Sequence, residues 1–126
     1  MEKSTRENPL LAIDLGGSKI VTALVSSKGE IVAREYIPTL AEEGTQAVVH
    51  RMLTTIDSLL SRANISRSSL STIAIAAAGA IDPEAGIVTA SPNLPGWYNV
   101  PLREIVQKET GKETFLINDA SAAALG

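Results

Sequence analysis

The chain has 126 residues, which is about the size of one ordinary domain and too short for two lobes with separate cores. Hydrophobic residues make up 44% and charged residues 20%, a balance that excludes a disordered chain. The formal net charge of −3 gives no indication of a nucleic-acid partner. With no cysteine and one histidine, the composition also excludes disulfides, cysteine nucleophiles and metal sites built from thiolates or several histidines.

Neither a membrane segment nor a targeting signal is expected. The apolar stretches are shorter than the roughly 20 residues that a membrane helix needs. Residues 1–8 are charged and lack the apolar centre of a signal peptide, so we expect a solvated leader followed by one domain over residues 9–126. These features predict a cytoplasmic protein without a membrane partner.

Three short strands joined by tight turns are expected first. Residues 10–15, LLAIDL, form an apolar run that two glycines follow, which is typical of a buried strand. Residues 19–25 form a second apolar run, and residues 26–29 have the composition of a turn. Residues 30–38 mix apolar and charged side chains, as an edge strand does. Such short connections imply an antiparallel meander.

Helical periodicity replaces the strand pattern over residues 45–63. The apolar side chains recur there at the spacing of an amphipathic helix with one buried stripe: Val49, Met52, Leu53, Ile56, Leu59, Leu60 and Ala63. Residues 71–78, STIAIAAA, predict a fourth strand. A crossover through the helix would place this strand beside the first one and parallel to it.

The rest of the chain alternates loop, helix and strand. Residues 80–99 are rich in proline and glycine, so we expect a loop with one short strand over residues 87–89. Helical spacing returns over residues 100–109, and Gly111 would end that helix. A fifth strand is expected over residues 114–117, and Asn118-Asp119 would open an alanine-rich helix.

This order of elements predicts an α/β fold that resembles the ribonuclease-H-like half-lobe of the actin and sugar-kinase superfamily. We expect a mixed five-stranded sheet with helices on both faces. The first three strands would be antiparallel, and the fourth and fifth would run parallel to the first.

The segment from Asp14 to Lys19, DLGGSK, is the first candidate site. Gly16 and Gly17 permit a tight turn whose N–H groups can face a phosphate, and Ser18 adds a hydroxyl. Asp14 ends an apolar run, where an unpaired carboxylate would be costly to desolvate, and it could hold Mg²⁺ through water. The segment matches neither the P-loop nor the GxGxxG pattern, so a plain hairpin turn is the alternative interpretation.

Asn118-Asp119 is the second candidate site, at an expected junction between strand and helix. A carboxylate there can accept the proton of a substrate hydroxyl that attacks a γ-phosphate. A simple helix N-cap is the alternative, because Asp and Asn are favoured at that position. The predicted topology places Asp14 and Asp119 at the carboxyl ends of strands in one sheet, which is where open α/β sheets bind ligands.

Residues 91–97, SPNLPGW, form the third candidate site. The two prolines stiffen the loop, which reduces the entropy lost when Asn93 is presented to a ligand. The Asn93 amide can both donate and accept, as a pair of sugar hydroxyls requires. The alternative is a surface loop held to the domain by Trp97, and the two interpretations are compatible.

Together the three motifs resemble the ROK family of repressors and sugar kinases. DLGGSK resembles the family's first phosphate motif, with Ser18 in place of the usual threonine. NLPGW resembles its sugar-side loop, and INDASAAALG its catalytic segment. The resemblance covers residues 10–126 and implies a glucokinase-like enzyme that transfers a phosphate from ATP, with Mg²⁺, to a hexose.

The resemblance also implies a role for each candidate residue. Asp119 would be the general base. The sugar-binding residues would be Asn93, Asn118 and Gly79, the last by letting the backbone approach the sugar. The residues that meet the phosphates of ATP would be Asp14, Gly16, Gly17, Ser18 and Lys19.

Several parts of the family's pattern have no counterpart in these residues. The adenosine-binding segment, the second phosphate motif and a zinc motif of Cys and His are missing, and the lone His50 cannot replace the last of these. We therefore expect an N-terminal lobe that is inactive alone and belongs to a longer, homo-oligomeric enzyme. The exposed apolar face of such a lobe would favour weak self-association.

Two other functions compete with the kinase. A sugar-sensing transcriptional regulator of the same family would carry a helix-turn-helix segment before the kinase-like part, whereas nine residues precede Leu10. A non-catalytic actin-like scaffold would not need Asp119. For the kinase, glucose is the expected substrate and N-acetylated hexosamines are the nearest alternatives.

Overall fold

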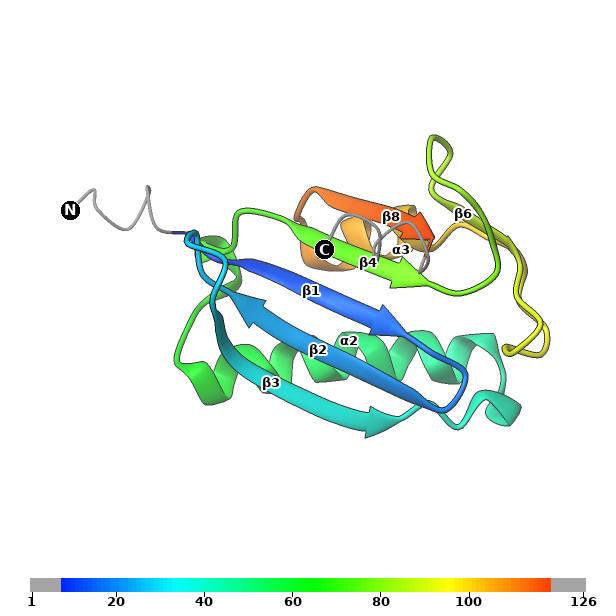
Figure 1. Cartoon of the computed structure of the whole chain (residues 1–126), viewed down its shortest axis with the longest axis horizontal. Helices are drawn as coiled ribbons and strands as arrows, with labels where there is room; N and C mark the ends of the chain where they lie inside the picture. Colours follow the sequence, from blue (N-terminus) through cyan, green and yellow to red (C-terminus); the bar gives the residue numbers. More distant parts are fainter. Residues whose placement is uncertain (1–7, 119–126) are drawn as a thin grey trace.

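The computed structural model describes residues 8–118. Its elements form a five-stranded sheet of order β3-β2-β1-β4-β8 and a three-stranded sheet of order β5-β6-β7, with two α-helices (Figure 1). In chain order the elements are β1 (Leu10–Leu15), β2 (Lys19–Val25), β3 (Ile31–Pro38), the 3₁₀ turn η1 (Ala41–Glu43), α2 (Thr45–Ala63), the 3₁₀ turn η2 (Arg67–Ser69), β4 (Ile73–Ala77), β5 (Ala80–Asp82), β6 (Ile87–Ala90), β7 (Tyr98–Val100), α3 (Leu102–Thr110) and β8 (Thr114–Asn118).

The five-stranded sheet has the predicted topology. β1 pairs with β2, and β2 with β3, in antiparallel register. β4 lies beside β1 in parallel register, and β8 lies parallel to β4. The predicted crossover from β3 through a long helix to a strand beside β1 is therefore confirmed, as is the α/β class of the fold.

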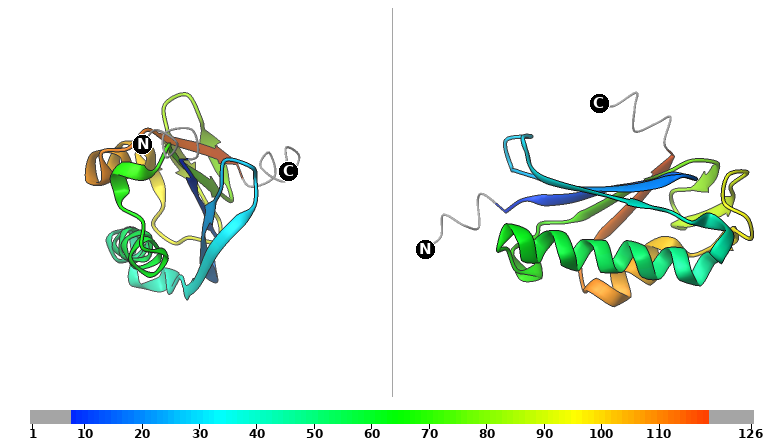
Figure 2. Two further views of the ribbon diagram at one scale, coloured as in Figure 1. Left: turned by 90° about the vertical axis from the view of Figure 1, so that its left-hand side faces the viewer. Right: turned by 90° about the horizontal axis from the view of Figure 1, so that it is seen from below.

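Both described helices cover the same face of this sheet (Figure 2). α2 turns the predicted stripe of Val49, Met52, Ile56, Leu59 and Leu60 inward and also buries Val48 and Thr55. α3 buries Leu102, Val106 and Thr110, and the side chain of Gln107 accepts a hydrogen bond from the N–H of Thr114 at the start of β8. The core thus lies between one face of the sheet and these two helices.

The two faces of the sheet differ because successive strand residues point to opposite sides. The face toward the helices is closed by side chains that are at most 2% exposed: Leu11, Ile13, Leu15, Ile20, Leu24, Ile73, Ile75 and Leu116. The opposite face is more open, with Tyr36 and Phe115 55% and 50% exposed. The helix that the sequence predicts after Asn118 falls on residues outside the described range.

The segment after β4 contains more strand than expected. Besides the predicted strand, which is β6, the chain forms β5 and β7, which pair with β6 on either side. Because β7 extends to Val100, α3 begins at Leu102 rather than at residue 100, and Pro101 precedes the helix instead of lying in its first turn. Strands of three residues are too short to show an alternating pattern in the sequence.

Candidate active site

The candidate residues that the structure describes gather where the parallel strands β1, β4 and β8 end, on the right of Figure 1. Leu15 of β1 is level with Ala77 of β4, which is level with Asn118 of β8. The three strands therefore end at one edge of the sheet, here called the carboxyl edge. The turn after β1, the glycine after β4 and the last residue of β8 are brought together there from three distant parts of the sequence.

The turn from Gly16 to Lys19 connects β1 to β2 at this edge. Its ends are joined by a hydrogen bond from the N–H of Gly16 to the carbonyl oxygen of Lys19, 3.0 Å. Gly17 has no room for a side chain, because a Cβ placed there would lie 2.8 Å from the Cβ of Asn93. The glycine thus permits a close contact between the first and third predicted motifs, which are far apart in the sequence.

The loop of residues 91–97 has some side chains buried in the domain and others exposed to solvent. Two successive turns form it, with hydrogen bonds from the N–H of Leu94 to the oxygen of Ser91 and from the N–H of Trp97 to the oxygen of Leu94, both 3.1 Å. Leu94 and Trp97 are 1% and 0% exposed, whereas Asn93 is exposed. Trp97 holds the loop to the domain, as the structural interpretation predicted, and the role of the exposed Asn93 in binding a ligand stays a prediction.

Gly79 contacts both the start of this loop and the last residue of β8. Its φ of +103° suits glycine, and a Cβ there would meet the oxygen of Ala90 at 2.5 Å and the Cα of Ser91 at 2.8 Å. The side-chain amide of Asn118 donates a hydrogen bond of 2.7 Å to the carbonyl oxygen of Gly79. Contacts therefore run from Asn118 through Gly79 to Ser91, and from Asn93 to Gly17.

Asp14 lies one residue before the end of β1, on the open face of the sheet. It is level with Ala76 of β4 and Val21 of β2, and its side chain is exposed. The inference that Asp14 would need compensation for burial was therefore wrong, since its carboxylate follows the alternation of the strand toward the open face. Its place at the carboxyl edge agrees with the prediction.

Ser18 and Lys19 are exposed at the end of the turn. The ammonium of Lys19 lies 5.2 Å from the centre of the Tyr36 ring on β3, a cation–π distance. Lys19 is thus directed along β2 and β3 in this structure. Asp119, the predicted base, lies outside the described residues.

No group of three or more His, Cys, Asp or Glu side chains that could hold a metal ion occurs within residues 8–118. His50, which the sequence did not favour as a metal ligand, is exposed on α2.

None of the helices within residues 8–118 has the length and apolar character that a membrane span requires.

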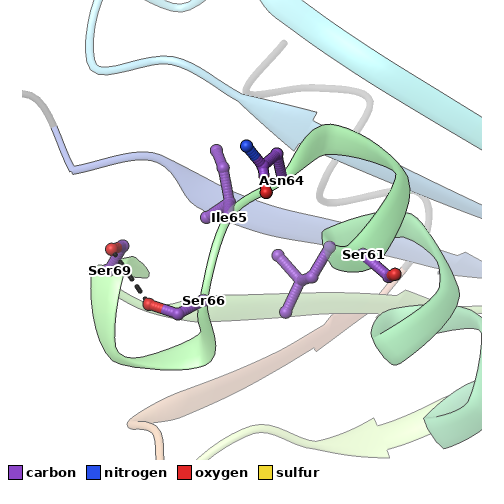
Figure 3. Close-up of a pocket in the computed structure, with 6 residues that line it drawn as sticks. Ser61, Asn64, Ile65, Ser66 and Ser69 are labelled. Atoms are coloured by element: carbon purple, nitrogen blue, oxygen red, sulfur yellow. Dashed lines mark hydrogen bonds between the residues drawn. The ribbon is translucent and has the colours of Figure 1, made fainter.

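Two hollows of the surface are lined by other described residues. One of about 510 Å³ lies at the end of α2 and is lined by Leu60, Ser61, Asn64, Ile65, Ser66 and Ser69 (Figure 3). It is near the opposite edge of the sheet, where Ser71 donates its N–H to Pro9 just before β1. A second hollow, between α2 and α3, is lined by residues that include Val49, His50 and Ile105. Neither contains a predicted site residue.

Thr39 belongs to the carboxyl edge but was missed by the sequence analysis. It follows β3 and is completely buried. Its hydroxyl donates to the carbonyl oxygen of Gly16 at 2.7 Å, and its N–H donates to that of Ser18 at 2.9 Å. A single threonine after an edge strand gives no signal in the sequence, because its partners lie more than 20 residues away.

Comparison with known proteins identifies the family of the chain. The sequence profile of the ROK family matches residues 10–126. The chain therefore belongs to the ROK family.

Its relatives include both enzymes and regulators. The chain is 40% identical to a glucokinase from Thermotoga maritima over 93% of its own length and 35% of that protein. It is 32% identical to a xylose repressor from Caldicellulosiruptor bescii over 93% of its length and 29% of that protein, and 33% identical to an N-acetylmannosamine kinase from Escherichia coli over 90% and 37%. The chain thus spans about a third of the relatives that it matches.

Solved structures show the same fold. A ROK hexokinase from Thermus thermophilus matches with a TM-score of 0.82 and 29% identity, over 93% of this chain and 37% of that one. A ROK glucokinase from Streptomyces griseus, solved with glucose and AMPPNP, matches with a TM-score of 0.81 and 25% identity, over 92% and 35%.

Proposed function

We propose that this chain is the N-terminal lobe of an ATP-dependent hexose kinase. Its carboxyl edge would bind both the sugar and the phosphates of ATP, so that the γ-phosphate is transferred to a sugar hydroxyl. The contact between Gly17 and Asn93 is the observation that carries this proposal, because it brings a phosphate-type turn against a loop suited to sugar hydroxyls. Phosphoryl transfer requires the acceptor hydroxyl and the transferred phosphate to be held in line and close together.

The backbone of the turn supplies the phosphate side of this site. Gly16 and Gly17 carry no side chains that would keep a phosphate from their N–H groups, and the Ser18 hydroxyl is exposed beside them. Lys19 would approach the phosphates by leaving its position over Tyr36, a contact worth only about 0.5–1 kcal/mol at an exposed site. The exposed carboxylate of Asp14 fits a Mg²⁺ ion held through water.

Asn93, Asn118 and Gly79 supply the sugar side. Asn93 offers a donor and an acceptor from a loop whose buried Leu94 and Trp97 keep it in place. Asn118 donates one amide hydrogen to the carbonyl oxygen of Gly79, which holds its amide group at the carboxyl edge, where it would bind a sugar hydroxyl. Asp119, directly after Asn118, would accept the proton of the attacking hydroxyl.

The relatives support a hexose as the class of substrate. The Thermotoga maritima protein is a glucokinase, and we propose glucose as the acceptor. The kinase for N-acetylmannosamine makes N-acetylated hexosamines the alternative. A sugar-sensing regulator is the second candidate function, because the xylose repressor has a similar identity over the same part of the chain.

A coupled assay of ADP release by the full-length protein tests the proposal. The acceptors are a panel of hexoses and their N-acetylated amines, and the control is the same reaction without sugar. ATP turnover that depends on one of these sugars supports the kinase. A folded protein that binds a sugar yet shows no turnover with any of them contradicts it and favours the regulator.

A further inference from the structure

We propose that Thr39, held in place by Arg51, is a positioning residue that aims the N–H groups of the Gly16–Lys19 turn at the phosphates of ATP. This inference rests on the proposed kinase function and concerns residues that do not touch the substrates themselves.

Thr39 holds two of the turn's carbonyl groups at once. Its hydroxyl donates a hydrogen bond of 2.7 Å to the carbonyl oxygen of Gly16, and its N–H donates one of 2.9 Å to the carbonyl oxygen of Ser18. Lys19 and Pro38 form the last paired residues of β2 and β3, so Thr39 continues that pairing by one residue and adds the hydroxyl bond. The turn is thus bonded to a segment outside its own hairpin.

The geometry of the peptide bond turns these contacts into an orientation. In a trans peptide the carbonyl oxygen and the following N–H point in opposite directions. When the oxygens of Gly16 and Ser18 face Thr39, the N–H groups of Gly17 and Lys19 must face away from it. The two carbonyl groups, which would repel an anion, are thus bound to Thr39. The two N–H groups, which can bind an anion, point to the opposite side of the turn.

Arg51 extends this arrangement to α2. Its guanidinium donates a hydrogen bond of 2.7 Å to the carbonyl oxygen of Thr39 and forms an ion pair with Glu43 of η1. The side chain of Arg51 is 21% exposed, so these contacts are partly shielded from water. Arg51 therefore fixes the backbone of Thr39 from the helix side.

The chain conformation after Thr39 agrees with a held position. Leu40 has a φ of 52°, in the left-handed region, which is unusual for a residue other than glycine. This residue turns the chain from β3 into η1 and α2, so that Arg51 of α2 comes within hydrogen-bond distance of Thr39. We infer that the contacts of Thr39 and Arg51 offset the strain at Leu40.

Thr39→Val in the full-length protein removes the hydroxyl bond but keeps the size and branching of the side chain. We expect the KM for ATP to rise at least about tenfold, the loss of about 1.4 kcal/mol in ground-state binding. The KM for the sugar should change less than twofold. Thr39→Ser, which keeps the hydroxyl, should restore the KM for ATP to within about threefold of the wild type.

Two matched controls separate positioning from general stability. Thr22 is as buried as Thr39, yet its hydroxyl has no hydrogen-bond partner among the described residues, so Thr22→Val should leave both KM values unchanged. Arg62 also lies on α2, donates to the oxygen of Arg34 at 2.9 Å and pairs with Glu35. Arg51→Gln should raise the KM for ATP, whereas Arg62→Gln should not.

The outcomes are distinguishable. An active wild type whose Thr39→Val variant keeps its KM for ATP overturns the inference and leaves the kinase in place. Equal rises in both KM values, accompanied by a lower Tm, also overturn it, because they show a purely structural role. A wild type without sugar-dependent turnover contradicts the kinase itself, and the inference with it.

Discussion

The two turns at the ends of β2 are built in different ways. The turn of residues 26–30 is closed by its own residues, since the hydroxyl of Ser26 accepts hydrogen bonds from the N–H groups of Lys28 and Glu30. A Cβ on Gly29 would meet no atom within 4 Å. The Gly16–Lys19 turn also has a hydrogen bond of its own, from Gly16 to Lys19, but in addition Thr39 binds two of its carbonyl oxygens and Asn93 lies directly against it.

The two turns therefore need glycine for different reasons. Gly29 has a φ of +87° and open space around it, so its turn requires glycine only for the backbone conformation. At Gly17 the restriction comes from Asn93, which belongs to a loop more than 70 residues away. A turn whose shape is set by distant segments is typical of a site, and the predictions below test whether the carboxyl edge behaves as one.

Asp119→Asn should have the largest effect. If Asp119 is the base at the carboxyl edge, its loss in the full-length enzyme should lower kcat by at least about a thousandfold while sugar binding is largely kept. Steady-state kinetics and sugar titration measure the two effects. The control is Asp57→Asn, which changes an exposed carboxylate of α2 that pairs with Arg67 of η2. Near-normal turnover of Asp119→Asn would exclude Asp119 as the base.

Gly79→Ala should have the next largest effect, on folding. The added Cβ would combine a left-handed φ of +103° with a clash at 2.5 Å against the oxygen of Ala90. We expect the free energy of unfolding to fall by at least about 2 kcal/mol, measured by denaturant titration.

Gly111→Ala is the matched control, because Gly111 has a φ of +72° and open space around it. Its loss should be smaller, about 1–2 kcal/mol from the backbone alone. Equal losses in the two variants would show that the close approach of Gly79 to Ala90 and Ser91 is unimportant.

Asn93→Ala should affect one substrate more than the other. Because Asn93 is exposed and hydrogen-bonding groups for the sugar are lost with it, the KM for the sugar should rise at least about tenfold. The KM for ATP should change far less. Equal changes in the two KM values, or no change, would leave the loop of residues 91–97 with a structural role alone.

Gly29→Ala should have the smallest effect. The variant places an alanine at a positive φ in an open turn, which costs about 1–2 kcal/mol of stability. Thermal unfolding checks that loss. Both KM values should stay unchanged, since the turn of residues 26–30 is at the other end of β2, and a kinetic effect would remove the distinction between the two turns.

Much of the fold could be predicted from the sequence because its long elements have strong patterns. α2 has the predicted bounds, Thr45–Ala63, and the apolar runs of β1 and β2 were also predicted in full. β5 and β7 were missed, since three residues carry no period, and the start of α3 was placed too early because β7 takes up Val100.

The site was predictable as a set of motifs but not as a set of contacts. Glycine and asparagine positions drew attention to the turn after β1 and to the loop of residues 91–97. Nothing in the sequence shows that Gly17 meets Asn93, that Asn118 binds the oxygen of Gly79, or that Thr39 holds the turn. These contacts join segments that only the folded sheet brings together.

The most direct test of the carboxyl edge as one site is Gly17→Ala in the full-length protein, with both substrates varied. Gly17 lies on the phosphate side, yet its new methyl group would strike Asn93 on the sugar side. We therefore predict that the KM values for ATP and for the sugar both rise, each by at least about tenfold, while Gly29→Ala changes neither. A rise in the KM for ATP alone, or no rise at all, would contradict the contact on which the proposed function rests.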